Sequence, residues 1–282
     1  MTQDSLVEDV HFCMDWITPQ ELGYKSIMVN VSDVCASGCT PKYITVALSL
    51  PKNVSSKWVE GFYEGAKKAC AESGVEIVGG DLTGSDKIMI SCCAMGKKVD
   101  GHGVATRSGA RAGYKIVVSG ECGNSAVGLG LLMGQIDKNI FTKEEQQHFI
   151  TSHLTPCAEI EFSKKVSSQM PFGSQYVMMD TSDGLMDALA KIADRSGVGM
   201  VIDFEKIPVC GAMKKLQNWQ DFVLFGGEDY KLVACVPQNV KCGFGTVIGE
   251  VVAGHGVNVK IGNVLQHFDL QTVQERAYKH FE

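Results

Sequence analysis

The sequence lacks any run of about 18 apolar residues, the length that a membrane-spanning helix needs, although 45% of its 282 residues are hydrophobic. Its first residues, MTQDSLVEDVHF, carry acids and lack the basic and apolar segments of a secretory signal peptide. Pro-rich, Ser-rich and single-sign stretches, which are typical of disordered tails, are also missing. These absences predict a folded cytoplasmic protein that is neither secreted nor inserted in a membrane.

An excess of positive charge is missing as well. The formal net charge is −6 and no stretch is dense in Lys and Arg, which argues against a nucleic-acid partner because such binding depends on neutralising phosphates. The eleven cysteines are scattered through apolar runs such as IMISCCAMG, without the spacing of a disulfide scaffold, so we expect reduced thiols. There is no C-x-x-C and no H-x-x-x-H pair, and local spacing therefore predicts no zinc site.

The order of the elements predicts an α/β (α+β) protein of two abutting halves, residues 1–108 and 109–282. The boundary lies in ATRSGARAGYKIVVSG, a polar junction that contains glycine and precedes a new strand. In the first half, apolar spacing predicts a helix over residues 25–37 that Gly38 ends, and residues 42–51 read as a strand. Ser55 or Ser56 begins a second helix that ends at Gly74, and VEIVGGD predicts a strand followed by a glycine turn.

The second half repeats this logic. A helix is predicted to be capped at Thr155 and Pro156, and strands are predicted at QYVMMD and VGMVIDF. The intervening helix begins near Ser182 and ends at Gly197. Its predicted buried stripe contains Leu185, Leu189, Ile192 and Ala193. GECGNSAVGLG lacks the G-K-[ST] ending of a phosphate loop, so it predicts only a loop that enters a Gly-rich helix.

A set of acids does not fall on obviously solvated faces. Two of them follow paired glycines, in GGD at 79–81 and GGED at 226–229, where the backbone can approach a ligand closely. Carboxylates held in this way suit Mg²⁺, which binds one or two acids, several waters and the oxygens of a substrate phosphate. The set contains Asp4, Asp33, Asp81, Asp180, Asp183, Glu228 and Asp229.

The stretch MDTSDGL has two interpretations. Ser182 or Asp183 could simply cap the following helix. Alternatively, Mg²⁺ between Asp180 and Asp183 reverses the local charge, so that the helix N-terminus holds a phosphate that also binds the metal.

Three further residues carry alternatives. Asp33 lies in a helix that is apolar nearly all round, so it needs a partner. His11 is either a satisfied histidine on a strand or a ligand contact. Arg107, beside Ser and Gly at the junction, is either a surface charge or a bidentate phosphate clamp, and we favour the clamp.

Several motifs occur in a recognisable order: DSLVEDVHF, NVSDVCASGCTPKYITVALSLP, VGGDLTGS, ATRSGARAGYKIVVSG, MDTSDGLMDALAKIADRSG and FGGEDYKL. Over essentially the whole chain they resemble the thiamine-monophosphate kinases of the PurM-like (aminoimidazole ribonucleotide synthetase-like) superfamily. The resemblance implies a two-domain fold, with an N-terminal sheet that forms a barrel in a homodimer and a C-terminal α/β domain. It also implies transfer of the γ-phosphoryl group of ATP to thiamine monophosphate, by positioning and several Mg²⁺ ions, without a covalent phospho-enzyme.

The resemblance assigns roles to residues of this chain. The implied Mg²⁺ ligands are Asp4, Asp33, Asp81, Asp180 and Asp183. The implied ATP contacts are Gly80, Asp81, Arg107 and Ser182, and the implied thiamine-phosphate contacts are His11, Glu228 and Tyr278.

The chain also departs from the family. The family begins earlier, with a helix, a Gly-Asp-Asp loop and a first strand, and the loop carries a further Mg²⁺-binding acid. Gln3 stands where the family has Ser or Thr. We therefore expect either that Met1 is an internal residue of a longer protein or that the copy is truncated and binds metal more weakly. Two other functions stay open: another ATP-dependent enzyme of the superfamily (selenophosphate synthetase-like or AIR synthetase-like), and a catalytically impaired nucleotide-binding dimer.

Overall fold

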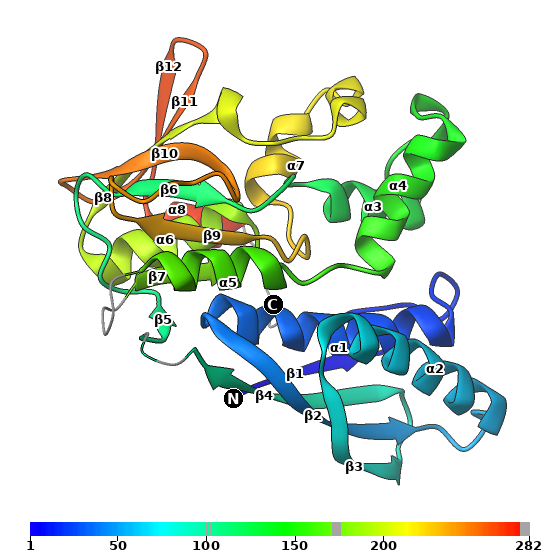
Figure 1. Ribbon diagram of the computed structural model, residues 1–282. Helices are drawn as coiled ribbons and strands as arrows, with labels where there is room; N and C mark the ends of the chain where they lie inside the picture. The colour runs from blue at the N-terminus through cyan, green and yellow to red at the C-terminus, as the bar shows by residue number, and fades with distance from the viewer. Residues whose placement is uncertain (100, 102, 171–175, 277–282) are drawn as a thin grey trace.

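The computed structural model describes residues 1–99, 101, 103–170 and 176–276, which form two β-sheets with helices packed on and between them (Figure 1). The first sheet has four strands in the order β1-β4-β2-β3, and the second has eight in the order β12-β11-β8-β10-β6-β9-β7-β5. Both contain parallel and antiparallel pairs. The predicted α/β (α+β) class is confirmed.

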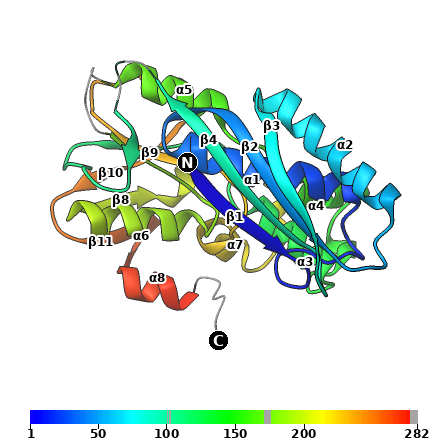
Figure 2. The same ribbon diagram turned by 90° about the horizontal axis from the view of Figure 1, so that it is seen from below.

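The first sheet is covered by helices on one face. Strand β1 pairs antiparallel with β4, β4 antiparallel with β2, and β2 parallel with β3. In Figure 2 the four strands lie in front of α1 and α2, and within the described residues no helix covers the face turned to the viewer. The bounds are β1 Thr2–Val7, α1 Pro19–Ala36, β2 Cys39–Leu50, α2 Ser56–Ser73, β3 Glu76–Gly84 and β4 Met89–Lys98.

Local signals explain these helices. The Ser55 side chain caps α2, and Gly74 ends it in the left-handed conformation with φ 71°, as predicted. Helix α1 begins six residues before its predicted start, at a capping box of Thr18 and Glu21. The two helices touch at Gly23, where an added Cβ would lie 1.9 Å from the carbonyl oxygen of Phe62.

The predicted glycine turn at VGGD is wrong. Strand β3 runs without interruption through Gly79, Gly80 and Asp81 to Gly84. An added Cβ at Gly80 would lie 1.9 Å from the carbonyl oxygen of Val46 on β2, so this glycine permits close strand pairing and not a reversal of the chain.

The second sheet carries most of the remaining helices. Its strands are β5 Ala105–Thr106, β6 Lys115–Val118, β7 Tyr176–Asp180, β8 Gly199–Asp203, β9 Leu232–Val236, β10 Thr246–Val252, β11 Gly256–Ile261 and β12 Val264–Phe268. The α-helices are α3 Asn124–Leu132, α4 Lys143–Leu154, α5 Ile160–Gln169, α6 Leu185–Ser196, α7 Trp219–Phe225 and α8 Leu270–Arg276. Three short 3₁₀ turns are η1 Lys138–Ile140, η2 Phe204–Lys206 and η3 Gly211–Lys215.

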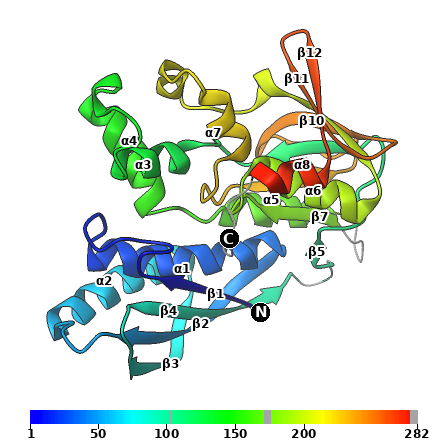
Figure 3. The same cartoon turned by 180° about the vertical axis from the view of Figure 1, so that it is seen from behind.

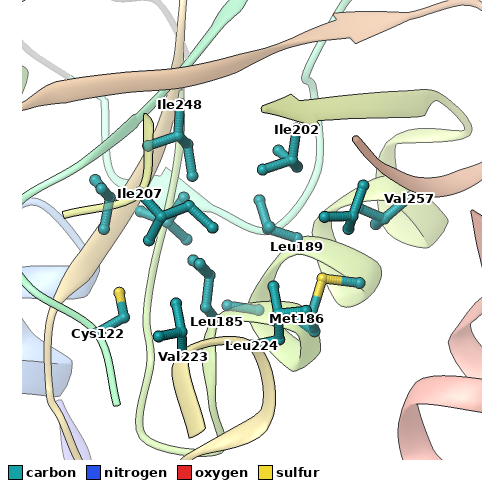
Figure 4. Close-up of a cluster of buried hydrophobic side chains, with 14 of the residues drawn as sticks. Cys122, Leu185, Met186, Leu189, Ile202, Ile207, Val223, Leu224, Ile248 and Val257 are labelled. Atoms are coloured by element: carbon teal, nitrogen blue, oxygen red, sulfur yellow. The ribbon is translucent and has the colours of Figure 1, made fainter. Parts of the chain in front are cut away.

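Helix α6 forms the centre of one hydrophobic core (Figure 4). Leu185 and Leu189 pack among side chains of β8, β10, β11 and α7. All four residues of the predicted stripe are at most 1% exposed, and Gly197 ends the helix with φ 63°. The stripe and the stop signal are confirmed, while the predicted start near Ser182 is early because α6 begins at Leu185.

The cap predicted at Thr155 and Pro156 is wrong. Thr155 is the C-cap of α4, a helix that was not predicted from the sequence, and α5 begins only at Ile160. Helix α4 starts with its own capping box of Thr142 and Glu145. A Thr-Pro pair between two helices is compatible with the end of the first and with the start of the second. The sequence pattern alone therefore did not distinguish the C-cap of α4 from an N-cap of α5.

Helix α1 lies between the two sheets (Figures 1 and 3). It contacts β2 and β4 of its own sheet and also β7 and α5 of the second half, which explains why it is apolar nearly all round. The second hydrophobic core accordingly contains residues of both halves. Among the described residues, no helix combines the length and the apolar composition that crossing a bilayer requires.

The two sheets bear on the predicted domain boundary. Strand β4 ends the first sheet at Lys98, and β5, at Ala105–Thr106, already pairs with β7 of the second. The chain thus passes from the first sheet to the second between Lys98 and Ala105, and the division at 108/109 stays a prediction.

Candidate functional site

Four of the predicted metal ligands come together where α1 meets the second sheet. Asp4 lies on β1 and Asp33 near the end of α1. Asp180 is the last residue of β7, and Asp183 lies in the turn that follows. Asp33 and Asp183 act electrostatically on Asp4 and on each other, and Asp33 acts on Asp180. We call these four residues the acid cluster.

Neighbouring polar groups hold the acid cluster in place. Ser32 donates a hydrogen bond to Asp180 Oδ2 at 3.0 Å, across the boundary between the two halves. The Thr2 hydroxyl donates to Asp33 Oδ2. The Asn30 side-chain oxygen accepts the backbone N–H of Asp4 at 3.2 Å. Two nearby residues of α1 therefore hold acids of β1 and β7, and a residue of β1 holds the acid of α1.

The cluster is electrostatically unfavourable without a cation. Burial and then the charge of Asp33 raise the pKa of Asp180 to about 7, and the Asp180 residue is 5% exposed. Partial desolvation, with Asp33 and Asp183 nearby, raises the pKa of Asp4 to about 6. Burial also raises the pKa of Asp33. Such shifts mark carboxylates whose negative charge is incompletely compensated.

The capping interpretation of MDTSDGL is wrong. The N-cap of α6 is Gly184, without a side-chain hydrogen bond to the helix. Ser182 instead donates to Asp180 Oδ1 at 3.2 Å, and Asp183 forms an ion pair with Lys191 at 3.0 Å. Ser182 and Asp183 therefore do not cap α6.

The predicted ATP contacts divide into two groups. Ser182 lies beside Asp180, and Arg107 is exposed but close enough to lower the pKa of Asp33. Gly80 and Asp81 lie apart, on the edge strand β3. Asp81 pairs in register with Ala47, on the face that bears Tyr43, whereas Asp4 pairs with the buried Cys92. Because residues opposite each other share a face, Asp81 lies on the other face of the sheet from Asp4.

The predicted substrate contacts form a second group beside the acid cluster. Glu228, in the loop before β9, pairs with Lys25 of α1 at 3.1 Å and approaches His153 Nδ1 at 3.4 Å. His11 acts electrostatically on Glu228 and accepts the backbone N–H of Val7 at 3.1 Å. Burial acts to raise the pKa of Glu228, but Lys25 and His153 outweigh it, and the pKa lies below its usual value. Tyr278 lies outside the described residues.

The loop that carries Glu228 is held in an unusual conformation. Glu228 and Tyr230 have φ of 62° and 51°, values that are uncommon for residues other than glycine. Between them, Asp229 is buried and accepts the backbone N–H groups of Gly123 and, at 2.9 Å, of Ser125. Asp229 thus anchors the start of α3 and takes no part in the acid cluster, while the strained backbone directs Glu228 toward Lys25.

The acid cluster has the chemistry of a site for hard cations. Its donors are all carboxylate oxygens, with Ser and Thr hydroxyls beside them, and such donors suit Mg²⁺ and not soft metals. Within the described residues, the four carboxylates do not bring three donor atoms within 4.8 Å of one another. A cation here would keep part of its shell for water or phosphate oxygens, as Mg²⁺ does.

The residues that position these acids were not predicted from the sequence. Thr2, Ser32 and Asn30 support the cluster, and Lys25 and His153 surround Glu228. Lys25 did carry a signal, because a cation in a helix that is apolar nearly all round needs a buried partner. Which partner it has depends on the packing of α1 against the second half.

Among known proteins, this chain is similar to thiamine-monophosphate kinases over its whole length. Residues 1–97 match the family "AIR synthase related protein, N-terminal domain". A thiamine-monophosphate kinase from Aquifex aeolicus is 37% identical over 292 aligned positions, which cover 100% of this chain and 87% of that protein. A similar protein from Bacillus subtilis, with the same name, is 29% identical, and the alignment covers 99% of this chain and 87% of the relative. A solved structure described as AaThiL complexed with AMPPCP and TMP has a TM-score of 0.85 and 36% identity, covering 99% of this chain and 86% of that one.

Proposed function

Because the chain belongs to the thiamine-monophosphate kinase family, we propose that it transfers the γ-phosphoryl group of ATP to thiamine monophosphate, giving thiamine diphosphate and ADP. The observation that carries the proposal is the convergence of Asp4, Asp33, Asp180 and Asp183 from both halves of the chain. The relative solved with AMPPCP, a non-transferring ATP analogue, and TMP supports the choice of substrates. The cytoplasmic location and the lack of a nucleic-acid partner stay predictions from the sequence.

The four acids fit several Mg²⁺ ions. The raised pKa values of Asp180 and Asp4 support this assignment, because a nearby cation would favour the ionised form of both carboxylates. Asp180 and Asp183 would hold metal from the second half, and Asp4 and Asp33 from the first. When bound, Mg²⁺ supplies the positive charge that offsets repulsion between two phosphates and the charge of the transferring group.

Side chains of the protein are proposed to orient the two substrates. Arg107 is exposed beside the acid cluster, where a guanidinium suits bidentate contact with ATP phosphate, and the Ser182 hydroxyl lies in the same turn. Glu228 and His11, with Tyr278, are proposed to hold thiamine monophosphate. Lys25 keeps Glu228 ionised, and an anionic carboxylate favours the cationic thiazolium ring of thiamine. The phosphoryl group then passes directly from ATP to the acceptor, with no covalent phospho-enzyme.

A homodimer completes this proposal. Asp81 and Gly80, on β3, lie on the opposite edge of the first sheet from β1, so within one chain they are remote from Asp4. The uncovered face of that sheet carries Tyr43 and Met89, which are 47% and 40% exposed. Pairing two such faces would bury these side chains and form the barrel that the family resemblance implies.

A kinase assay tests the proposed function. The protein is incubated with thiamine monophosphate, ATP and Mg²⁺, and thiamine diphosphate and ADP are quantified. Asp180→Asn should lower turnover at least about tenfold, since losing a metal ligand removes more than about 1.4 kcal/mol of transition-state stabilisation. Asp86→Asn, an exposed acid on a turn, is the matched control and should leave the rate unchanged. ATP binding without product would instead support an impaired nucleotide-binding dimer.

A further inference from the structure

Three potential metal ligands converge outside the acid cluster. They are Glu121 in the loop before α3, His148 on α4 and Cys210 before the short turn η3. A carboxylate oxygen, an imidazole nitrogen and the thiol sulfur all lie within 4.8 Å of one another. Glu121 Oε2 and His148 Nε2 are 3.9 Å apart. The residues are separated by 27 and 62 positions in the chain, so no local motif reveals them.

The backbone that carries these three residues is firmly held. Helices α3 and α4 pack so closely that a Cβ on Gly128 would lie 2.1 Å from the carbonyl oxygen of Phe149, the neighbour of His148. The backbone N–H of Cys122 donates to the carbonyl of Pro208 at 3.1 Å, which ties the Glu121 loop to the segment that carries Cys210. Fixed backbones with adjustable side chains favour ligand binding, because little order is lost when the ligand enters.

The Glu121 carboxylate is also oriented. Its Oε2 atom accepts a hydrogen bond from Asn124 Nδ2 at 3.0 Å. Such a partner directs one carboxylate oxygen and is typical of the groups that surround metal ligands. Cys210 is half-buried and packs against the core of the second half, which limits the positions of its sulfur.

We propose that Glu121, His148 and Cys210 form a binding site for Zn²⁺. Thiolate and imidazole are donors that Zn²⁺ prefers and Mg²⁺ does not, so the site differs chemically from the acid cluster. Ligand bonds of about 2.0–2.3 Å place neighbouring donors of a tetrahedral ion about 3.3–3.8 Å apart. The present separations need small side-chain movements, which the exposed His148 permits. Three protein donors leave one position for water or a bound molecule.

A cavity of about 810 Å³ adjoins the site. Glu121 and His148 line it, as do Lys231 and the exposed thiol of Cys157. A fourth ligand could therefore enter from solvent through this cavity. Cys157 is not one of the three grouped donors, and it provides a matched cysteine on the same cavity.

Metal titration of the full chain tests the site. The metal-free protein is titrated with Zn²⁺ in excess Mg²⁺, which keeps the acid cluster from competing, and Co²⁺ is used in parallel. We expect one Zn²⁺ per chain, a thiolate-to-Co²⁺ charge-transfer absorption band, and slower alkylation of Cys210 when Zn²⁺ is present. Cys210→Ser should abolish the absorption band, and Cys210→Ser and His148→Ala should each weaken Zn²⁺ binding at least about tenfold.

The control variants decide the outcome. Cys157→Ser should bind Zn²⁺ and give the Co²⁺ band as the wild type does. Zn²⁺ binding that is unchanged in both Cys210→Ser and His148→Ala, or that is lost in Cys157→Ser, would overturn the proposal. If Cys210→Ser does not fold, Glu121→Gln and His148→Ala give the same test, because these side chains are 44% and 47% exposed. None of these results depends on kinase activity, so the proposed function can fail or hold independently.

Discussion

Lys25 Nζ and Glu228 Oε1 lie 3.1 Å apart, although one belongs to α1 and the other to the loop before β9. The Lys25 side chain is 1% exposed and the Glu228 side chain 27%. His153 Nδ1, which lies 3.4 Å from the other carboxylate oxygen, has its pKa lowered to about 4 by burial and by the charge of Lys25. Lys25 is therefore the cation that balances Glu228 at neutral pH, and it links the two halves beside the proposed substrate site.

Replacing Lys25 should affect both stability and substrate binding. Lys25→Met keeps the apolar stem but leaves the Glu228 charge uncompensated. Breaking a buried pair costs about 3 kcal/mol, and the remaining exposure of Glu228 reduces that cost. We expect urea unfolding to show a loss of about 1–3 kcal/mol, and the KM for thiamine monophosphate to rise more than the KM for ATP.

Two controls separate these effects. Lys25→Arg retains the charge and should restore most of the affinity for thiamine monophosphate. Lys68→Met, at an exposed position on α2, should change neither quantity. Equal increases in both KM values for Lys25→Met would assign it a purely structural role.

Gly80 should tolerate no side chain. In Gly80→Ala the Cβ would lie 1.9 Å from the carbonyl oxygen of Val46, so β3 must separate from β2. Gly84→Ala, on the same strand, has nothing within 4 Å of its Cβ. We expect thermal unfolding to show about 2 kcal/mol or more of destabilisation for Gly80→Ala, a typical cost of overpacking, and less than about 0.5 kcal/mol for Gly84→Ala. Similar melting of both variants would mean that the two strands can separate at little cost.

The acid cluster should make stability depend on pH in a specific direction. Asp180 has a pKa of about 7 in the folded protein against 3.8 for the free side chain. The folded state therefore binds the proton more tightly, and its stabilisation is complete below about pH 4 and is lost as pH rises through about 7. Without Mg²⁺, the contribution of Asp180 to the free energy of unfolding should fall across this window by an amount on the order of 4 kcal/mol.

The difference between wild type and Asp180→Asn isolates this contribution. Urea unfolding in EDTA from pH 4 to 8 should show wild type losing stability relative to Asp180→Asn, which cannot titrate at that position. Mg²⁺ should flatten the difference, because a bound cation favours the ionised carboxylate. A difference that is independent of pH in EDTA would show that Asp180 is ionised throughout, contrary to its burial.

The predictable parts of the fold and of the candidate site were those with local causes. Ser55 begins α2 and Gly74 ends it, as predicted, and the apolar stripe of α6 is buried. Both could be predicted because capping and periodicity depend on residues close together in the sequence. The need of Asp33 for polar partners was also correctly predicted, since burial penalises an ionised carboxylate. Thr2 and Arg107 lower the pKa of Asp33 without fully offsetting its burial, and both are distant from it in the sequence.

What could not be predicted depends on tertiary packing. The glycines of β3 predicted a turn because glycine is common in turns, yet Gly80 is required by the approach of Val46. Asp81 and Asp4 were both predicted as Mg²⁺ ligands, but strand order and register place them on different edges and faces of the sheet. The spacing of residues in the sequence specifies neither the strand order nor the register.

The position of Asp81 leads to a test of the proposed dimer. Strands β1 and β3 are the two edges of the first sheet. In one of the two closures that two-fold symmetry allows, β3 of each protomer lies beside β1 of its partner. Asp81 would then lie beside β1 of the partner, and a local twist of the edge strand β3 would turn its carboxylate from the uncovered face to the acid cluster of the partner. Asp81→Ala and Asp180→Ala should each abolish kinase activity as homodimers, because each removes a proposed metal ligand from both sites.

Mixing the two inactive variants should restore activity. A mixed dimer contains one site with both defects and one site with neither, so subunit exchange at equal concentrations should return about a quarter of the wild-type activity. Asp33→Ala mixed with Asp180→Ala is the matched negative control, since both acids belong to the cluster of a single chain and every site then retains one defect. Activity from the control pair, or none from the Asp81 pair despite demonstrated exchange, would show that Asp81 acts within its own chain. Strand β3 would then have to leave its place in the first sheet, because in the present strand order β3 and β1, which carry Asp81 and Asp4, are opposite edges.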